Sequence, residues 1–297
     1  AEDRPERSDA PPSGASTARP EAGGGNPNIM PPQSSHSACA TGGVDRLDIS
    51  LYGSWSELVW TSLTARLNEA RDAAAKATST EGTFISSPLG DELLVKPHGV
   101  KKGIFCTWLL KWRGCDISIV NQRDAHCTSP SLFITIHSRV LLALHWSIVW
   151  EEFLSLLKAL GFRYVHGVPS RLDICADLPG QSVHPFLKAF QEQRVISSAR
   201  KWGLYGDGPE CGTGVQLGKG DIILRIYDKA AECEHNEEKR ELLIQERWRG
   251  EDCDEATRVE FQLRRPVLKQ MGARDMEFLP RVMHLIVAYC CQCWCRI

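Results

Sequence analysis

The chain has 297 residues, of which 42% are hydrophobic and 24% are charged, and its formal net charge is −2. This length and composition suit one or two globular domains with a sizeable core. No stretch approaches the roughly 18–20 uninterrupted apolar residues of a membrane-spanning helix, so we expect no membrane association. The near-neutral charge argues against a histone-like basic protein, although a neutral chain can still present one basic face to a polyanion.

The 12 cysteines are scattered through a chain too long for a disulfide scaffold, so we expect reduced thiols and a cytoplasmic protein without a secretory signal. The cysteine-rich end, residues 290–295, fits no common zinc pattern. We interpret it as an atypical or truncated C-terminus.

Residues 1–43 are rich in Pro, Gly, Ser and Ala and poor in aromatic residues. Such a segment buries too little apolar surface to offset the entropy of ordering, so the sequence predicts a disordered tail over 1–43 and a folded domain over 44–297.

The folded part is predicted to alternate between strands and helices. In chain order, we expect a strand over 44–51, a helix over 54–76 capped by Ser54, a hairpin over 104–121 that turns at Arg113–Gly114, a strand over 132–137 and a helix over 146–160. There follow a strand over 171–178, a helix over 184–193, strands over 195–201, 213–217 and 221–227, a helix over 230–248, a strand over 257–264, and helices over 266–272 and 275–289.

These elements predict an α+β fold, with a largely antiparallel sheet and helices packed on one face. The stretch Arg46-Leu47-Asp48-Ile49 recurs as Arg171-Leu172-Asp173-Ile174, each time on a predicted strand with a helix downstream. This repeat suggests a duplicated strand–helix unit.

Three predicted strands combine an apolar face with a polar face that carries reactive groups. Side chains alternate across a strand, so residues i, i+2 and i+4 share one face. The polar faces hold Asp173, Cys175 and Asp177 on the first strand, Arg225, Tyr227 and Lys229 on the second, and Arg258, Glu260, Gln262 and Arg264 on the third. A solvated sheet face is the simple interpretation, but this selection of groups also makes a coherent site.

Such a site could act on a phosphodiester. Carboxylates hold hard divalent cations such as Mg²⁺ or Mn²⁺, and cationic groups stabilise charge on a phosphoryl group. A tyrosine oxygen could attack the phosphorus as a covalent nucleophile. Asp173 and Asp177 lie roughly 13 Å apart along a strand, so they are not expected to share one ion. We favour Asp173 with Glu260.

Several segments, in this order, resemble the trans-acting rolling-circle replication initiators of plasmids and phages, also called replication initiation factors. They are Val44–Asp48, Lys96–Val100, Trp108–Gly114, Arg171–Asp177, Gly218–Gly220 leading into Arg225–Lys229, and Arg258–Arg264. Together the resemblance covers roughly residues 44–280.

The resemblance implies a sequence-specific enzyme that nicks one strand of a replication origin and leaves a 5′-phosphotyrosine. Tyr227 matches the nucleophile position, Asp173 and Glu260 match acidic positions assigned to a metal, and Lys229 and Arg225 would contact the scissile phosphate. It also implies a homodimer that binds duplex and single-stranded origin DNA and works with a host helicase and polymerase. Asp177 is a third candidate metal ligand, and the candidate DNA contacts are Lys96, Lys101, Lys102, Lys111, Arg113 and Lys219.

The same residues allow alternative assignments of the nucleophile and of the function. Tyr205 is a competing nucleophile, and the acidic segment 232–255 is expected to face away from DNA. The chain lacks the His-hydrophobe-His motif of better-known nicking enzymes, so no histidine is assigned as a ligand. A catalytically inactive DNA-binding regulator from a mobile element, or a conjugative mobilisation relaxase, would fit the same residues.

Overall fold

The computed structural model describes residues 40–77, 81–124, 128–206 and 212–296. The chain divides into two units, Ala1–Ser37 and Ala38–Ile297. The first unit, and with it most of the predicted tail, lies outside the described residues. Within the second unit the first strand begins at Thr41, before the predicted domain start at Val44.

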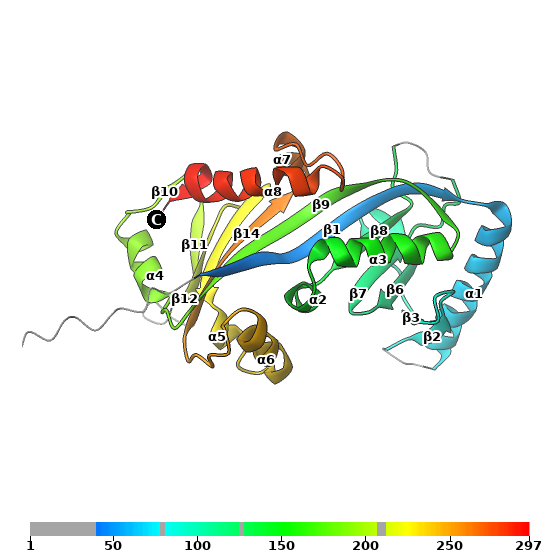
Figure 1. The fold of residues 1–297 in the computed structure, drawn as a ribbon, viewed down its shortest axis with the longest axis horizontal. Helices are drawn as coiled ribbons and strands as arrows, with labels where there is room; N and C mark the ends of the chain where they lie inside the picture. The colour runs from blue at the N-terminus through cyan, green and yellow to red at the C-terminus, as the bar shows by residue number, and fades with distance from the viewer. Residues whose placement is uncertain (1–39, 78–80, 125–127, 207–211, 297) are drawn as a thin grey trace, which may run out of the picture. The chain divides into compact units, whose positions relative to one another are not determined.

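The second unit is a mixed α+β fold (Figure 1). Its first half contains β1 (Thr41–Trp55), α1 (Glu57–Lys76), β2 (Thr83–Ser86), β3 (Glu92–Val95), β4 (Val100–Lys102), β5 (Ile104–Cys106), β6 (Trp108–Trp112), β7 (Cys115–Ile119), β8 (Leu132–Ile136), α2 (Ser138–Ala143) and α3 (Trp146–Ala159). Its second half contains β9 (Phe162–Pro179), α4 (His184–Gln191), β10 (Ile196–Ser197), β11 (Trp202–Gly206), β12 (Gly212–Leu217), β13 (Ile222–Asp228), α5 (Lys229–Glu232), α6 (Glu237–Glu246), β14 (Ala256–Arg264), α7 (Arg265–Gln270), α8 (Leu279–Ala288), the π-helical turn η1 (Tyr289–Trp294) and β15 (Cys295–Arg296).

An 11-stranded sheet runs in the order β11-β12-β13-β14-β9-β1-β8-β7-β6-β3-β2, and its strand pairs are antiparallel. The predicted fold class is therefore confirmed.

The two long strands β1 and β9 lie side by side in the sheet, with four strands beyond β9 and five beyond β1. In each half a long strand leads into a helix, later strands pair in turn so that the last adjoins the long strand, and two helices follow. The second half also contains α5 and α6 before its last strand. The two sequence repeats pair with each other, with Arg46 opposite Asp173 and Asp48 opposite Arg171. Arg46 binds Asp48 at 3.0 Å, and Arg171 binds Asp173 at 2.5 Å. The repeat thus marks a pseudo-twofold axis between two copies of one unit, as predicted.

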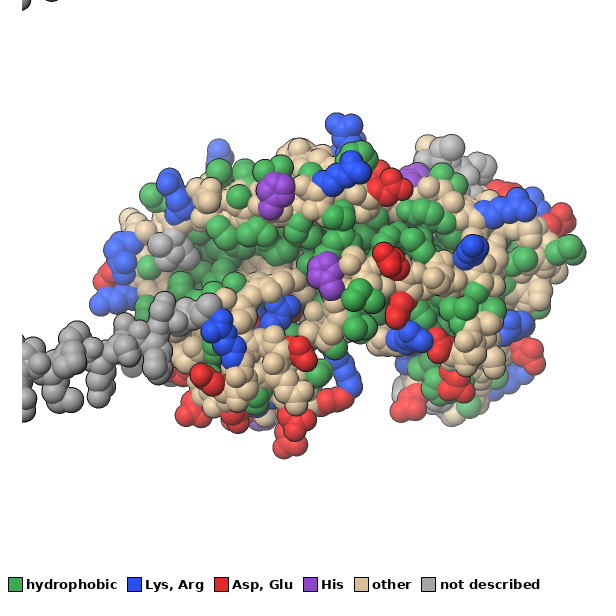
Figure 2. Space-filling model, viewed as in Figure 1, with side chains coloured by type: hydrophobic (Ala, Val, Ile, Leu, Met, Phe, Trp, Pro, Cys, Tyr) green, Lys and Arg blue, Asp and Glu red, His purple; other side chains and the backbone are tan. Residues whose placement is uncertain are grey.

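One face of the sheet forms the main core with the helices. Helices α1, α3, α4, α7 and α8 contribute buried apolar side chains to the same cluster as the inward-facing strand residues. Ring contacts fix several of these interfaces, among them Trp112 against Phe153 with centroids 5.0 Å apart. A hollow of about 610 Å³ lies on this face, lined by the sheet residues Ile174, Val259 and Phe261 and by apolar residues of α2 and α8, and Figure 2 shows hydrophobic side chains between α8 and α3.

Two smaller helices, α5 and α6, form a separate cluster with α2. Its buried members are Leu142, Ala230, Cys233, Leu243, Trp248 and Ala256. Within the described residues, no helix is both long and apolar enough to cross a bilayer.

The hairpin prediction at Arg113–Gly114 is confirmed, since both residues have positive φ angles, 46° and 78°, at the turn between β6 and β7. Positive φ at both central residues matches the right-handed twist of the paired strands.

Two local predictions are wrong and a third has different bounds. Ser54 lies within β1, and the cap of α1 is Ser56, whose Oγ accepts a hydrogen bond from the Val59 N–H at 3.4 Å. The single helix predicted over 230–248 is two helices, because the Asn236 side chain caps α6 and ends the continuous helical hydrogen bonding. The strand predicted over 195–201 shortens to Ile196–Ser197.

Candidate functional site

The polar faces of β9, β14 and β13 lie side by side in the sheet, as the sequence predicted. Arg225 pairs with Glu260, which pairs with Cys175, and in the next row Tyr227 pairs with Arg258. Because partners in an antiparallel pair project to the same side, these side chains form one polar surface. It lies on the face of the sheet opposite the main core.

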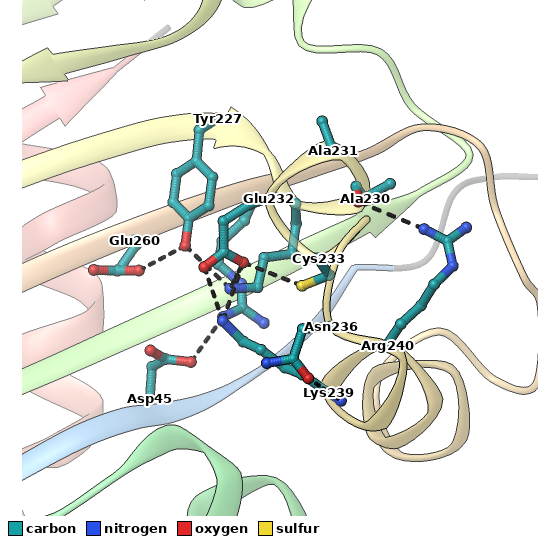
Figure 3. Close-up of polar contacts among 12 residues, drawn as sticks. Asp45, Tyr227, Ala230, Ala231, Glu232, Cys233, Asn236, Lys239, Arg240 and Glu260 are labelled. Atoms are coloured by element: carbon teal, nitrogen blue, oxygen red, sulfur yellow. Dashed lines mark hydrogen bonds and ion pairs between the residues drawn. The ribbon is translucent and has the colours of Figure 1, made fainter. Parts of the chain in front are cut away.

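Tyr227 and Glu260 are in direct contact at this surface (Figure 3). The Tyr227 hydroxyl donates a hydrogen bond to Glu260 Oε2 at 3.0 Å. Arg225 donates to Glu260 Oε1 at 3.1 Å and to Gln262 Oε1 at 3.2 Å, so both carboxylate oxygens of Glu260 are engaged. Burial, and then the Glu260 charge, raise the pKa of Tyr227 far above its usual value. The phenol is therefore protonated at neutral pH and has a carboxylate positioned to accept its proton.

A buried lysine lies beside the tyrosine hydroxyl. Asp228 ends β13 and caps α5 by accepting the Ala230 N–H at 2.9 Å, which turns the chain so that Lys229 packs under Tyr227. Lys229 Nζ lies 3.5 Å from the Tyr227 hydroxyl and 5.5 Å from its ring centroid. Burial, reinforced by the nearby Arg258 charge, lowers the pKa of Lys229.

The start of the acidic segment also belongs to this surface. Glu232 binds Lys229 at 2.7 Å and Lys239 at 2.8 Å, and Figure 3 shows Lys239 reaching from α6 toward Glu232. Burial alone would raise the pKa of Glu232, but the two ammonium groups outweigh it and lower the value to about 2. The prediction that segment 232–255 faces away is therefore wrong at its first turn, because the lysines neutralise the acid locally.

An ion-pair network fixes the adjoining strands. Arg258, 1% exposed, binds Asp177, 0% exposed, through two bonds of 2.5 and 2.7 Å, and it binds Asp45 at 2.7 Å. Asp45 lies at a register shift in β1 between Val44 and Arg46, the arrangement of a β-bulge. The sequence did not indicate Asp45 as a site residue, because the alternation of side chains along a strand does not predict a β-bulge.

Asp173 is buried next to this network. Arg171 holds its carboxylate through Nε at 2.8 Å and through a terminal nitrogen at 2.5 Å. Burial raises the pKa of Asp173 to about 6 against the opposing effect of Arg171, and the Glu260 charge adds to the rise.

A small pocket of about 220 Å³ brings these groups together. Its lining includes the predicted residues Asp173, Tyr227, Lys229 and Glu260, and it adds Asp45, Arg46, His137, Ser138, Arg171, Glu232 and Lys239. The predicted nucleophile, its acidic neighbours and one predicted cation thus meet at one pocket. Asp177 and Arg225 do not line this pocket. Asp177 is buried and bound by Arg258, and Arg225 is bound to Glu260.

The carboxylates do not form a metal centre in this arrangement. Across residues 40–296, leaving out the gaps in the description, no group of three His, Cys, Asp or Glu side chains is placed to hold a metal ion. Arg171 holds Asp173, Arg258 holds Asp177, and Glu260 is shared between Arg225 and Tyr227. The donor set therefore does not fit Mg²⁺ or Mn²⁺ without displacing arginine.

The six predicted DNA contacts lie elsewhere, since none lines the pockets around Tyr227. Lys101 and Lys219 are exposed. The other four bind protein groups: Lys96 binds the Glu81 carbonyl at 2.8 Å, Lys102 the Thr135 hydroxyl at 3.2 Å, Lys111 the Asp116 carboxylate at 2.6 Å, and Arg113 Asp91 and Glu152 at 3.0 and 3.1 Å.

The reactive groups occur in only one half of the duplication. When the two halves are aligned on their four-residue repeats, Phe133 on β8 corresponds to Glu260 on β14. Ser118 on β7 likewise corresponds to Arg225 on β13. Neither can accept a proton from a phenol or carry a positive charge. The first half keeps the framework of the unit without this chemistry.

Comparison with known proteins gives limited similarity. No protein-family model matches the chain, and no curated protein matches it. Among solved structures, a rolling circle replication initiator protein from Geobacillus stearothermophilus is similar over 87% of this chain and 86% of its own, with 16% identity and a TM-score of 0.45.

Proposed function

We propose that this protein is a rolling-circle replication initiator that nicks and rejoins one DNA strand through Tyr227. The observation that carries the proposal is the contact between the Tyr227 hydroxyl and Glu260 at 3.0 Å, with Lys229 Nζ 3.5 Å from the same oxygen. A nucleophile, a proton acceptor and a cation thus meet at one atom. The segments that resemble replication initiators support the same assignment.

The proposed reaction is a transesterification. Glu260 accepts the Tyr227 proton as the phenolic oxygen attacks the phosphorus of a DNA phosphodiester. The bond from phosphorus to the 3′-oxygen breaks, and that oxygen leaves and takes up a proton from solvent. The products are a 5′-phosphotyrosine and a free 3′-hydroxyl, and attack of that hydroxyl on the phosphotyrosine reverses the step.

The neighbouring cations supply electrostatic stabilisation. Lys229 lies beside the oxygen on which negative charge develops as the proton leaves, and Arg225 flanks Glu260 on the other side. Fixed charges in a largely buried site stabilise such charge more strongly than the same charges in water.

The further parts of the proposal follow from the sequence resemblance. They are recognition of an origin as duplex and single strand, a homodimer, cooperation with a host helicase and polymerase in the cytoplasm, and dependence on Mg²⁺ or Mn²⁺. Such an ion would have to displace an arginine from its carboxylate. Comparing cleavage in EDTA with cleavage in added Mn²⁺ tests the last point, and equal rates would contradict it.

A trapping assay tests the nucleophile. The full chain is incubated with Mn²⁺ and a labelled pool of single-stranded oligonucleotides of random sequence, and denaturing gels detect a covalent adduct. We expect an adduct that mass spectrometry maps to Tyr227, no adduct with Tyr227→Phe, and unchanged DNA binding by that variant.

Tyr205→Phe is the matched control and is expected to form the adduct. An adduct that persists in Tyr227→Phe and disappears in Tyr205→Phe would assign the nucleophile to Tyr205. DNA binding without any adduct, in the pool or in oligonucleotides enriched from it by binding, would favour the inactive regulator.

A further inference from the structure

A second pocket adjoins Tyr227 on the side toward the sheet edge. It has a volume of about 570 Å³, within the range of small-molecule sites. Tyr227, Glu232 and Glu260 line both this pocket and the smaller one already described. The far end of the second pocket is formed by Tyr205 on the edge strand β11 and by Thr213 and Gly214 on β12. Tyr227 therefore stands between two hollows.

Gly214, which has no side chain, leaves the space between Tyr205 and Tyr227 open. Tyr205 pairs with Gly214, and Gly214 pairs with Tyr227, so the three residues lie in one row across the sheet. The two tyrosine Cα atoms are two strand spacings apart, about 10 Å. A Cβ at Gly214 would meet the Ile226 carbonyl oxygen and the Tyr227 Cβ at 2.8 Å each. Glycine thus leaves a floor of bare backbone between two aromatic side chains.

Tyr205 is held in place without belonging to the core. Its side chain is among the exposed large apolar groups, at 47%. Its hydroxyl donates to Gln216 Oε1 at 2.7 Å, and Gln216 Nε2 in turn donates to the Gly218 carbonyl at 3.3 Å. These bonds fix the end of the ring while leaving much of its surface open to solvent.

The charges of the two pockets differ. In the smaller pocket the cations Arg46, Arg171, Lys229 and Lys239 balance the acids Asp45, Asp173, Glu232 and Glu260. Among the described residues that line the second pocket, Arg225 is the one cation, against the carboxylates of Asp228, Glu232 and Glu260. An uncharged base can stack on an aromatic ring at such a surface and donate N–H hydrogen bonds to its carboxylates.

We propose that the second pocket is a nucleobase subsite, in which Tyr205 stacks against a base that flanks the phosphate attacked by Tyr227. The inference rests on the proposed function and deepens it. Tyr205 is then a positioning residue that fixes the register of a single strand. The bare backbone at Gly214 gives the base room to lie between Tyr205 and Tyr227.

Binding of two fluorescein-labelled probes tests this subsite. One is an oligothymidylate of about 12 nucleotides, and the other is an abasic chain of equal length that carries the phosphates alone. The wild-type full chain should bind the oligothymidylate more tightly. Tyr205→Ala should weaken that binding about 5- to 150-fold and change the abasic affinity less than about twofold. Tyr205→Phe, which keeps the ring, should bind both probes as the wild type does.

Trp202→Ala is the matched control. Trp202 lies on the same edge strand and is 52% exposed, but it projects to the other face of the sheet, near Phe190 of α4. Its loss should leave both affinities unchanged. Tyr205→Leu provides a second test that keeps bulk and removes stacking, in case Tyr205→Ala folds poorly.

The subsite is refuted if wild type binds both probes equally, or if Tyr205→Ala and Tyr205→Leu weaken both probes alike. Its failure is distinguishable from failure of the nicking function. Suppose that binding depends on the base and on Tyr205 and persists in Tyr227→Phe, but that the wild type forms no covalent adduct. This result would support the subsite and contradict the nicking function. An adduct at Tyr227 without base-dependent binding would support the nicking function and contradict the subsite.

Discussion

Asp173 makes the stability of the protein depend on pH in a direction opposite to that of most carboxylates. Burial raises its pKa from 3.8 to about 6, and only 3% of its side chain is exposed, so solvent screens the effect little. Between these pH values the folded protein holds a proton that the unfolded chain has released. Stability from this group is therefore present below pH 4 and is lost as pH rises through 6.

The magnitude follows from the size of the shift. A difference of about 2 pKa units corresponds to about 3 kcal/mol of unfolding free energy. Asp173→Asn removes the titrating group and keeps a similar shape. Because the unfolded group is already partly ionised at pH 4, the stability of this variant relative to wild type should be about 2–2.5 kcal/mol more favourable at pH 7 than at pH 4. Contributions from other groups cancel in the difference.

Urea unfolding of both proteins at several pH values between 4 and 8 measures this difference. Asp48→Asn is the matched control, because Asp48 has the same pairing with an arginine at the symmetry-related position but a side chain that is 20% exposed. It reports the loss of the pairing alone. A stability difference for Asp173→Asn that stays constant with pH would refute the assignment of a raised pKa to this carboxyl.

Two further predictions concern its neighbours. Arg258→Met leaves the fully buried Asp177 without its cation and should cost about 3–5 kcal/mol in urea unfolding, whereas adding Asp177→Leu should recover most of that loss; a single variant as stable as wild type would contradict this. Glu260→Gln removes the proton acceptor of Tyr227 and should slow adduct formation about 10²–10⁴-fold in timed quench experiments, with DNA affinity retained; an unchanged rate would show that Glu260 is not the base.

Strand periodicity was enough to predict the chemistry of the polar face. Alternation along 221–229 and 257–264 places Tyr227 and Glu260 on polar faces, and it is a local property that the backbone of any strand imposes. The pairing of the two strands then brings the phenol and the carboxylate into contact. The repeat of four residues beginning at Arg46 and Arg171 likewise predicted the duplication, because it lies on the axis that relates the two halves.

The sequence by itself thus determined the fold class, the duplicated unit and the polar surface that carries Tyr227, Lys229 and Glu260. Only the tertiary structure decided which partner each charge has. Asp177 is bound by Arg258 from another strand, and Glu232 folds back onto Lys229 where the chain turns after β13. Such pairings depend on distances between segments far apart in the chain and on a balance of burial and charge, which no local pattern encodes.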